Sequence, residues 1–358
     1  MTHIWLRSET KPSEERTALT PGNAEKLIAA GFDLTVEKST QSCFDWQEYE
    51  SVGCNIAVEH SWYHVAPDDA IIFGLKELQQ SEDLLTRKHI HFAHVYKEQA
   101  GWQQFLGRFD KEGCLYDLEY LVDETGRRVA AFGHWAGFAG AALAVLTWAN
   151  HQMGKSPVLG PVSSRHNQNV LVDEIKAALG NSKQRPRVLV IGSLGRCGKG
   201  AIDLLKAVNA EVVAWDLEET SVGGPFDEIL DCDIFLNCVF VSESIPPFLT
   251  RDQLKKPGRR LAVICDVSCD PYGAYNPLPV YEKCTTFDSP VEVLDNGPNP
   301  LYLIAIDHLP SLLPRESSED FCNQLMPHLL QLNNLDQGVW KRANDLFVSK
   351  SGLIESKK

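Results

Sequence analysis

Short apolar segments rich in β-branched residues alternate with longer amphipathic segments along the chain. This alternation predicts parallel sheets whose strands are joined by crossover helices. In the first third of the chain the predicted strands are residues 3–6, 33–36, 70–74, 91–93 and 114–117. A second series comprises residues 187–191, 211–215, 233–240, 261–267 and 301–306.

Helices are predicted between these strands from their boundary residues. Pro21 and Gly22 indicate a helix start, and Gly31 is a suitable C-terminal stop. From Phe132 onward, small and apolar residues predict a closely packed helix that leads into a second domain. Further helices are expected at residues 171–179 and from Ser317 onward, with fraying of the polar end.

Together these elements predict an α/β fold with two Rossmann-like, doubly wound domains. We expect the first domain in residues 1–131 and the second in residues 132–315. Residues 316–358 are expected to form a helical segment that returns to the first domain. The length of 358 residues agrees with about two domains of roughly 150 residues each.

Charge and hydropathy exclude several classes of partner. The chain has 34 Lys and Arg against 48 Asp and Glu, so its formal net charge is −14. Such a field repels phosphate backbones and anionic membranes, so we expect neither a nucleic-acid nor a membrane partner. The longest apolar run, residues 136–149, is shorter than the roughly 18 residues of a membrane span, and the N-terminus carries charges where a signal peptide is apolar.

The ten cysteines are scattered, without a CxxC pair, and most lie in apolar segments. We therefore expect buried free thiols and a reducing, cytoplasmic compartment, with a zinc site or a disulfide as the alternatives.

A glycine-rich turn follows the first strand of the second series. Residues 187–201 read RVLVIGSLGRCGKGA, which gives a GxxGxxG spacing before an amphipathic helix. Residues without a Cβ allow the backbone to approach a pyrophosphate, whose charge then lies at the helix N-terminus. The cofactor-binding residues expected in this turn are Gly192, Gly195, Arg196, Cys197 and Gly198.

The next predicted strand ends in Asp216, 24 residues after Gly192, which is close to the spacing expected of a ribose-binding acid. Its carboxylate would accept hydrogen bonds from the ribose hydroxyls and repel a 2′-phosphate. We therefore expect NAD rather than NADP as the cofactor. The structural alternative is an unliganded turn, with Asp216 capping the next helix.

Ionisable residues follow several strands of the first domain. They lie in RSETKPSEER after the first strand, in GLKE at residues 74–77, in FAHVYK at residues 92–97, and in YDLE and GRRV between residues 116 and 129. Ligands of open α/β sheets bind beyond the carboxyl ends of the strands. We therefore expect these side chains to converge on one crevice: Lys76, Glu77, His94, Lys97 and Glu119.

These residue types suit proton transfer and the binding of carboxylates. A lysine crowded by other cations has a lowered pKa, and histidine titrates near neutrality, so Lys76 and His94 are the candidate acid–base pair. Glu77 and Glu119 would bind a substrate ammonium or tune the lysine. The cations expected to hold carboxylates are Lys11, Arg16, Lys97, Arg127 and Arg128.

Structural alternatives remain for each of these residues. A strand-end lysine is often surface decoration, and Arg127 and Arg128 could form a solvated turn. His89, His91 and His94 suggest a metal, but residues 89 and 91 share one face of a strand and residue 94 faces away, so we expect no metal.

Several motifs together resemble the NAD-dependent, lysine-forming saccharopine dehydrogenases of the aminoadipate route to lysine. The resemblance runs from about residue 4 to residue 347 and is more distant to alanine dehydrogenase and transhydrogenase. Its motifs are RSETKPSEERTALTP, GLKE, FAHVYK, YDLEYL, GRRVAAFG, AGFAGAA, IGSLGRCGKGAIDLL, GGPFDEI and IDHLPSLLPRE.

The resemblance implies reversible oxidative cleavage of saccharopine to lysine and 2-oxoglutarate, with the active site in a cleft between a substrate domain and an NAD domain. It assigns acid–base catalysis to Lys76 and His94 and ribose binding to Asp216. It also places Asp307 and His308 beside the nicotinamide and gives substrate-site charges to Arg16, Glu77, Lys97, Glu119 and Arg128.

The chain departs from the family at His134 and Trp135, where a less polar aromatic pair is expected near the cofactor, and its end, ESKK, lacks a peroxisomal tripeptide. A monomeric chain is compatible with the sequence.

Two other functions remain open: oxidative deamination of a smaller amino acid, as in alanine dehydrogenase, and a non-catalytic NAD-sensing module.

Overall fold

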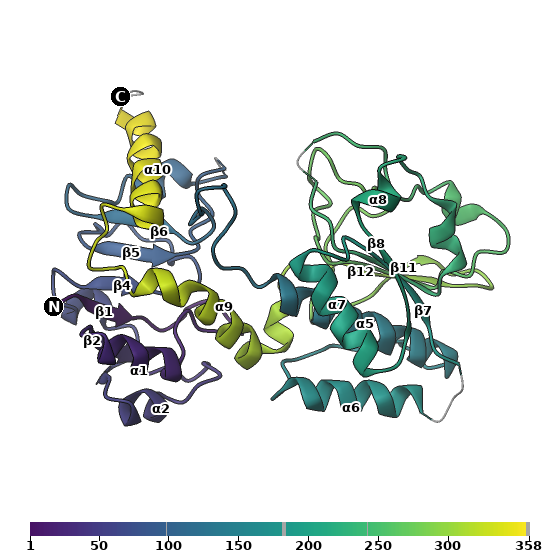
Figure 1. The fold of residues 1–358 in the computed structure, drawn as a ribbon, viewed down its shortest axis with the longest axis horizontal. Helices are drawn as coiled ribbons and strands as arrows, with labels where there is room; N and C mark the ends of the chain where they lie inside the picture. The colour runs from purple at the N-terminus through teal and green to yellow at the C-terminus, as the bar shows by residue number, and fades with distance from the viewer. Residues whose placement is uncertain (98, 181–183, 242, 356–358) are drawn as a thin grey trace. The chain divides into compact units, whose positions relative to one another are not determined.

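The computed structural model describes residues 1–97, 99–180, 184–241 and 243–355, and it divides into two compact units (Figure 1). The first unit comprises Met1–Ala131 and Pro314–Lys358, and the second comprises Phe132–Leu313. The chain thus returns to the first unit at Pro314, slightly before the boundary expected from the sequence.

The first unit is built on a six-stranded sheet with strand order β3-β2-β1-β4-β5-β6. All of its neighbouring strands are parallel. The carboxyl ends of the strands therefore lie along one edge of the sheet. The strands are β1 (His3–Leu6), β2 (Asp33–Glu37), β3 (Asn55–Ala57), β4 (Ile71–Phe73), β5 (Lys88–His91) and β6 (Cys114–Asp117).

Helices from both ends of the chain pack on this first sheet. The indole of Trp340 contacts the ring of Tyr116 in β6 at a centroid distance of 5.6 Å. Phe321 likewise lies 5.8 Å from Phe92, just after β5. These contacts attach the C-terminal segment to the first unit. The helices are α1 (Pro21–Ala29), α2 (Trp46–Ser51), α3 (Trp62–Val65), α4 (Trp102–Leu106), α9 (Pro314–Leu329) and α10 (Gly338–Glu355).

The second unit contains a six-stranded sheet with strand order β11-β12-β10-β9-β7-β8. Its strands are parallel except for the edge strand β11, which pairs antiparallel with β12 and was not predicted. β11 is largely exposed, so it lacks the buried apolar run of the other strands. The strands are β7 (Arg187–Ile191), β8 (Glu211–Trp215), β9 (Ile234–Asn237), β10 (Val263–Asp266), β11 (Glu292–Asp295) and β12 (Leu301–Ile304).

Apolar layers cover both faces of the second sheet. Val188 and Val190 of β7 join the core made with α5 (Gly133–Gln152), α6 (Gln168–Leu179) and α7 (Arg196–Ala207). Leu189 and Ile191 join the opposite core, which includes Phe226 and Phe248. In Figure 1, α8 (Leu217–Thr220) lies across the sheet from α5, α6 and α7. Among the described residues of this unit there are also three short 3₁₀ helices: Asp227–Asp231, Gln253–Lys255 and Leu309–Leu312.

The predicted strands are mostly confirmed, but several end earlier than expected. The largest difference is in β5, which spans Lys88–His91 rather than residues 91–93. After this strand the chain turns, and His94 adopts a positive φ of 56°. The short strand β3 was missed because three partly exposed residues give too short a pattern. No helix within the described residues combines the length and hydropathy needed to cross a bilayer.

Candidate functional site

The predicted charges of the first unit lie beyond the carboxyl ends of four strands. Arg16 belongs to the long loop after β1, while Lys76 and Glu77 follow β4. His94 and Lys97 follow β5, and Glu119 follows β6. Since β1, β4, β5 and β6 are neighbours in a parallel sheet, these segments share one edge.

Glu119 is the centre of one ion-paired group. Its Oε2 lies 3.0 Å from His94 Nδ1, and its Oε1 accepts a hydrogen bond from Lys97 Nζ at 2.8 Å. Arg128 Nη2 lies 3.8 Å from the same Oε1, and Arg128 Nε donates to the Glu119 carbonyl at 3.1 Å. The hydrogen bond with His94, reinforced by Lys97, lowers the pKa of Glu119 to about 2. This carboxylate is therefore ionised at neutral pH.

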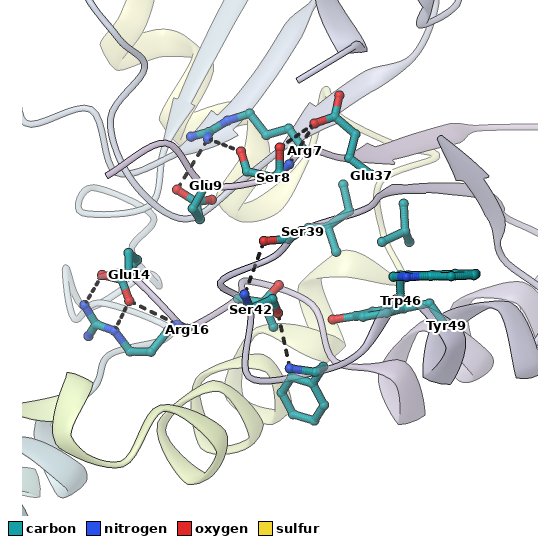
Figure 2. Close-up of a pocket in the computed structure, with 14 residues that line it drawn as sticks. Arg7, Ser8, Glu9, Glu14, Arg16, Glu37, Ser39, Ser42, Trp46 and Tyr49 are labelled. Atoms are coloured by element: carbon teal, nitrogen blue, oxygen red, sulfur yellow. Dashed lines mark hydrogen bonds and ion pairs between the residues drawn. The ribbon is translucent and has the colours of Figure 1, made fainter. Parts of the chain in front are cut away.

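Glu14 is the centre of a second, buried group in the loop after β1 (Figure 2). Its two carboxylate oxygens accept hydrogen bonds from Nε and Nη2 of Arg16, both at 2.7 Å. Burial would raise the pKa of Glu14, but the hydrogen bonds and charge of Arg16 overcome this and lower it. Glu14 was not predicted, because its only signal in the sequence is its position two residues before Arg16.

Lys76 extends toward this group, and its Nζ lies 3.9 Å from Glu14 Oε2. Burial, followed by the charge of Arg16, lowers the pKa of Lys76, and Glu14 offsets only part of this effect. A lysine with a lowered pKa can exchange a proton nearer neutral pH. Its surroundings therefore suit the predicted acid–base role.

Glu77 pairs with a further residue of the loop after β1. Lys11 Nζ donates to Glu77 Oε1 at 3.2 Å. The other oxygen, Oε2, is buried and has no hydrogen-bond partner within the described part of the chain. Burial would raise the pKa of Glu77, but its own backbone amide and Lys11 together lower it. An ionised carboxylate with an unused oxygen can accept a ligand ammonium.

Arg127 does not join the Glu119 group with its neighbour. It is exposed at the end of a turn, where its backbone amide donates to Asp123 Oδ1 at 3.0 Å. The solvated-turn alternative thus describes Arg127 but not Arg128.

His89 and His91 are fully buried in β5, with ring centroids 6.1 Å apart. Burial lowers the pKa of His89 to about 3 and that of His91 well below its usual range. Both side chains are therefore neutral core residues, whereas His94 lies beyond the strand and partly exposed. No group of three or more metal-ligating side chains occurs among the described residues.

The glycine turn of the second unit has the close backbone approaches expected for dinucleotide binding. Gly192 has a φ of 87°, and a Cβ at this position would lie 2.7 Å from Val239 Cγ2. A Cβ at Gly198 would lie only 2.1 Å from the Gly192 carbonyl oxygen. Gly195 is the N-cap of α7, so the turn leads directly into that helix. These residues fit a pyrophosphate at the N-terminus of α7.

Asp216 follows β8 and contacts the same turn. Its Oδ2 accepts a hydrogen bond from the Leu194 amide at 2.8 Å, and its Oδ1 accepts one from the Leu217 amide at 3.0 Å. It also caps α8 in a reciprocal arrangement with Glu219. The capping alternative is thus present in the structure. The carboxylate remains only partly buried, so its charge still fits a ribose.

The other expected cofactor residues lie around this sheet. Arg196 and Cys197 begin α7, and burial raises the pKa of the Cys197 thiol. Asp307 and His308 follow β12, where Asp307 Oδ1 and His308 Nδ1 lie 2.7 Å apart. His134, one of the two departures from the family, lies 4.0 Å from Asp203 Oδ2 through its Nε2.

A buried polar network that sequence analysis missed joins the ends of β9 and β10. Asp266 Oδ1 accepts hydrogen bonds from Asn237 Nδ2 at 3.0 Å and Ser268 Oγ at 2.7 Å. Its Oδ2 accepts one from the Tyr281 hydroxyl at 2.7 Å. The available signal was the single acid at the end of the run LAVICD. All ten cysteines are free, as expected, and the Sγ atoms of Cys269 and Cys284 lie 3.3 Å apart.

Comparisons with known proteins give consistent results over nearly the whole chain. Residues 5–139 match the family model described as alanine dehydrogenase/PNT, N-terminal domain. A relative from Emericella nidulans is 52% identical and covers 98% of both chains. A relative from Candida albicans is 51% identical and covers 96% of both chains. A relative from Schizosaccharomyces pombe is 49% identical, and the match covers 96% of this chain and 97% of the relative. All three are named saccharopine dehydrogenase (NAD(+), L-lysine-forming).

Solved structures agree on the fold. An L-alanine dehydrogenase is similar with a TM-score of 0.65 at 14% identity, covering 97% of this chain and 94% of its own. A transhydrogenase from Sinorhizobium meliloti gives a TM-score of 0.63 at 16% identity, covering 93% and 95%. At such identities the likeness concerns the fold alone.

Proposed function

Because the chain belongs to the family of NAD-dependent, lysine-forming saccharopine dehydrogenases, we propose that it interconverts saccharopine with L-lysine and 2-oxoglutarate and that Lys76 and His94 carry the proton transfers. The observation that supports these residue roles best is the pair of ionic groups at one sheet edge. One contains Lys76 beside Glu14, and the other contains His94 beside Glu119.

NAD is the cofactor, and when bound it accepts the hydride from the substrate carbon. In our proposal, the backbone of Gly192, Gly195 and Gly198 gives the pyrophosphate access to the N-terminus of α7. Asp216 accepts hydrogen bonds from the ribose hydroxyls. Arg196, Cys197, Asp307 and His308 are the remaining proposed cofactor contacts.

Substrate recognition requires cations for carboxylates and anions for ammonium groups. Saccharopine carries three carboxylates, whereas the whole chain has a net charge of −14. Lys97 and Arg128 therefore provide a local positive surface next to Glu119. Glu77, with one oxygen unused among the described contacts, is suited to the ammonium of the lysine part. Arg16 and Arg127 stay candidate carboxylate ligands.

Two proton carriers are needed around the substrate nitrogen and carbon. Hydride loss from the secondary amine leaves an imine, to which water must add before lysine is released. His94 accepts the proton of the attacking water. Lys76, whose pKa is lowered by burial, exchanges a proton at the substrate nitrogen as the carbon–nitrogen bond breaks.

A substrate panel tests this proposal directly. NADH oxidation with 2-oxoglutarate should require L-lysine and be much slower with L-ornithine, L-alanine or ammonium. Product analysis should find saccharopine in an amount equal to the NADH consumed. Equal activity with pyruvate and ammonium would instead indicate the alanine dehydrogenase-like deaminase. NADH binding without turnover of any substrate would indicate the sensing module.

We further propose a cytoplasmic, monomeric protein that has no nucleic-acid partner. Ten free thiols and the absence of a paired CxxC support a reducing compartment. Cell fractionation, and light scattering of the purified chain at micromolar concentration, test the compartment and the monomer.

A further inference from the structure

The backbone of Lys76 is held from both sides by two buried residues of the loop after β1. Glu9 Oε1 accepts a hydrogen bond from the Leu75 amide at 2.6 Å, and Glu9 Oε2 accepts one from the Lys76 amide at 3.0 Å. On the other side of the same residue, Arg7 Nη2 donates to the Lys76 carbonyl oxygen. Both polar groups of the Lys76 main chain are thus bonded to charged side chains.

Arg7 and Glu9 are also bonded to each other. Arg7 Nη1 lies 3.3 Å from Glu9 Oε2, and the two side chains are 1% and 7% exposed. Figure 2 shows this contact beside the Glu14 and Arg16 pair. A buried charge pair stabilises a fold only when its geometry is good and its remaining atoms are hydrogen-bonded. The additional partners are backbone atoms of residues 8, 75 and 76, and Arg7 Nε has no partner among the described residues.

The sequence around Lys76 accommodates this pair. A Cβ added to Gly74 would lie 2.4 Å from Nε and 2.5 Å from Cζ of Arg7. Only glycine therefore leaves room for the guanidinium where the chain leaves β4. The motifs RSE and GLKE thus form one contact, although about 65 residues separate them along the chain.

We infer that Arg7 and Glu9 are positioning residues that fix the backbone of Lys76, so that its ammonium stays beside Glu14 and the substrate. This inference rests on the proposed catalytic role of Lys76. Misplacement of a catalytic group by about 1 Å can cost as much as 100-fold in rate. Arg7 and Glu9 hold the carbonyl and the amide of Lys76 by hydrogen bonds. Loss of either residue should therefore displace Lys76 and lower kcat.

Two substitutions disturb the pair in independent ways. In Glu9→Gln the side-chain NH₂ faces a backbone amide that needs an acceptor, and Arg7 loses its counter-charge. Gly74→Ala leaves Glu9 intact and displaces the Arg7 guanidinium from the Lys76 carbonyl. Glu37→Gln is a matched control, because Glu37 is also buried and accepts the amides of Ser8, His60 and Trp62 rather than that of Lys76.

The readouts are kcat, its pH profile, the Kd of NADH and the thermal midpoint of the purified full chain. Glu9→Gln and Gly74→Ala should each lower kcat about 10- to 100-fold while the Kd of NADH stays within about twofold of the parent. One limb of the parent pH profile of kcat should be due to Lys76 and be absent in Lys76→Met. In Glu9→Gln and Gly74→Ala this limb should move to higher pH, because Lys76 becomes more solvated. The charges around its ammonium are Glu14, Arg16, Lys11 and Glu77. Glu37→Gln should change the thermal midpoint without moving this limb.

The outcomes separate this inference from the proposed function. If Lys76→Met keeps parent turnover, the catalytic role of Lys76 is wrong, and the inference falls with it. If Lys76→Met is inactive while Glu9→Gln and Gly74→Ala keep the parent kcat and pH profile, only the inference is overturned. If Glu9→Gln does not fold, Gly74→Ala alone decides between these results.

Discussion

His94 Nδ1 lies 3.0 Å from Glu119 Oε2, in a turn where His94 has a φ of 56°. Since the pKa of Glu119 is lowered to about 2, its carboxylate accepts hydrogen bonds and does not donate them at neutral pH. Nδ1 of His94 must therefore carry the hydrogen of this contact, which assigns the tautomer. In the neutral ring, Nε2 is then the atom that accepts a proton.

This tautomer predicts a graded effect of substitutions in the acid–base group. Lys76→Met and His94→Gln should each lower kcat about 10²- to 10⁴-fold, because each removes a positioned proton carrier. Glu119→Gln should have a smaller effect, since it weakens the orientation of His94 but leaves the imidazole in place. Steady-state assays of NADH oxidation measure kcat, and fluorescence titration with NADH checks that cofactor binding is retained. Losses below about threefold in both Lys76→Met and His94→Gln would contradict the assignment.

The ends of the strands were more predictable than the partners of the charges. Lys76 and His94 could be placed because apolar segments precede them and because parallel strands bring their carboxyl ends to one edge. The strong pairing of Arg16 with Glu14 could not be predicted, because a charged loop does not reveal which charges become buried together. The positive φ of His94 was equally hidden, since it depends on how the chain leaves β5.

In the second unit, too, features set by local spacing could be predicted, whereas contacts between distant segments could not. Gly192 and Asp216 were found from their spacing, which the strand–turn–helix geometry sets. The Asp266 network joins segments from two strands and a distant loop, and only the folded sheet brings them together. The edge strand β11 escaped prediction because its exposed residues lack an apolar pattern.

Asp216 should determine the choice of cofactor. We expect NAD to be preferred over NADP by at least about tenfold in kcat/KM, equivalent to about 1.4 kcal/mol, because the carboxylate repels a 2′-phosphate. Asp216→Asn should relax this preference while still accepting the Leu194 amide, whereas Asp216→Ala should also weaken NAD binding. Assays with both cofactors at several concentrations measure the ratio. Equal use of NAD and NADP by the parent chain would refute the role of Asp216.

Arg16→Ala should act first on stability. The Arg16 and Glu14 side chains are 3% and 4% exposed, so removal of the arginine leaves a buried carboxylate without its partner. Loss of one member of a buried pair typically costs about 3 to 5 kcal/mol. Urea unfolding should show a lower free energy of unfolding, and the double variant Arg16→Ala, Glu14→Ala should recover part of it. Parent stability in Arg16→Ala would show that the pair contributes little.

Arg128→Ala should weaken the binding of 2-oxoglutarate. The Arg128 side chain is 40% exposed, so its removal leaves the core intact and weakens the positive surface beside Glu119. We expect a higher KM for 2-oxoglutarate and a smaller rise of this KM with salt, since screening then has less attraction to remove. Lys111→Ala is the matched control, because Lys111 is an exposed cation that precedes β6, at the opposite end of this strand from Glu119. If both variants have the same KM and the same salt dependence, 2-oxoglutarate does not bind at Arg128.

Buried histidines should make the first unit sensitive to acid. An unfolded histidine has a pKa of about 6.5, whereas burial lowers the pKa of His89 to about 3. Between these two values the unfolded chain binds more protons at this site than the folded chain, so the free energy of unfolding falls as the pH falls. Asp117 acts in the opposite direction below about pH 6, because burial raises its pKa to about 6 and the folded chain holds its proton.

His89→Phe isolates this effect. The His89 ring lies 5.3 Å from that of Trp62 and 5.7 Å from that of Phe109, and its nitrogens have no hydrogen-bond partner within the described residues, so phenylalanine suits the site. From pH 6 to pH 4, the variant should lose up to about 1.4 kcal/mol less stability per pH unit than the parent, the value for one proton. Urea unfolding across this range measures both slopes. The control His64→Phe changes an exposed histidine and should keep the parent dependence of the free energy of unfolding on pH. If His89→Phe and the parent show the same dependence, His89 is not held neutral by burial.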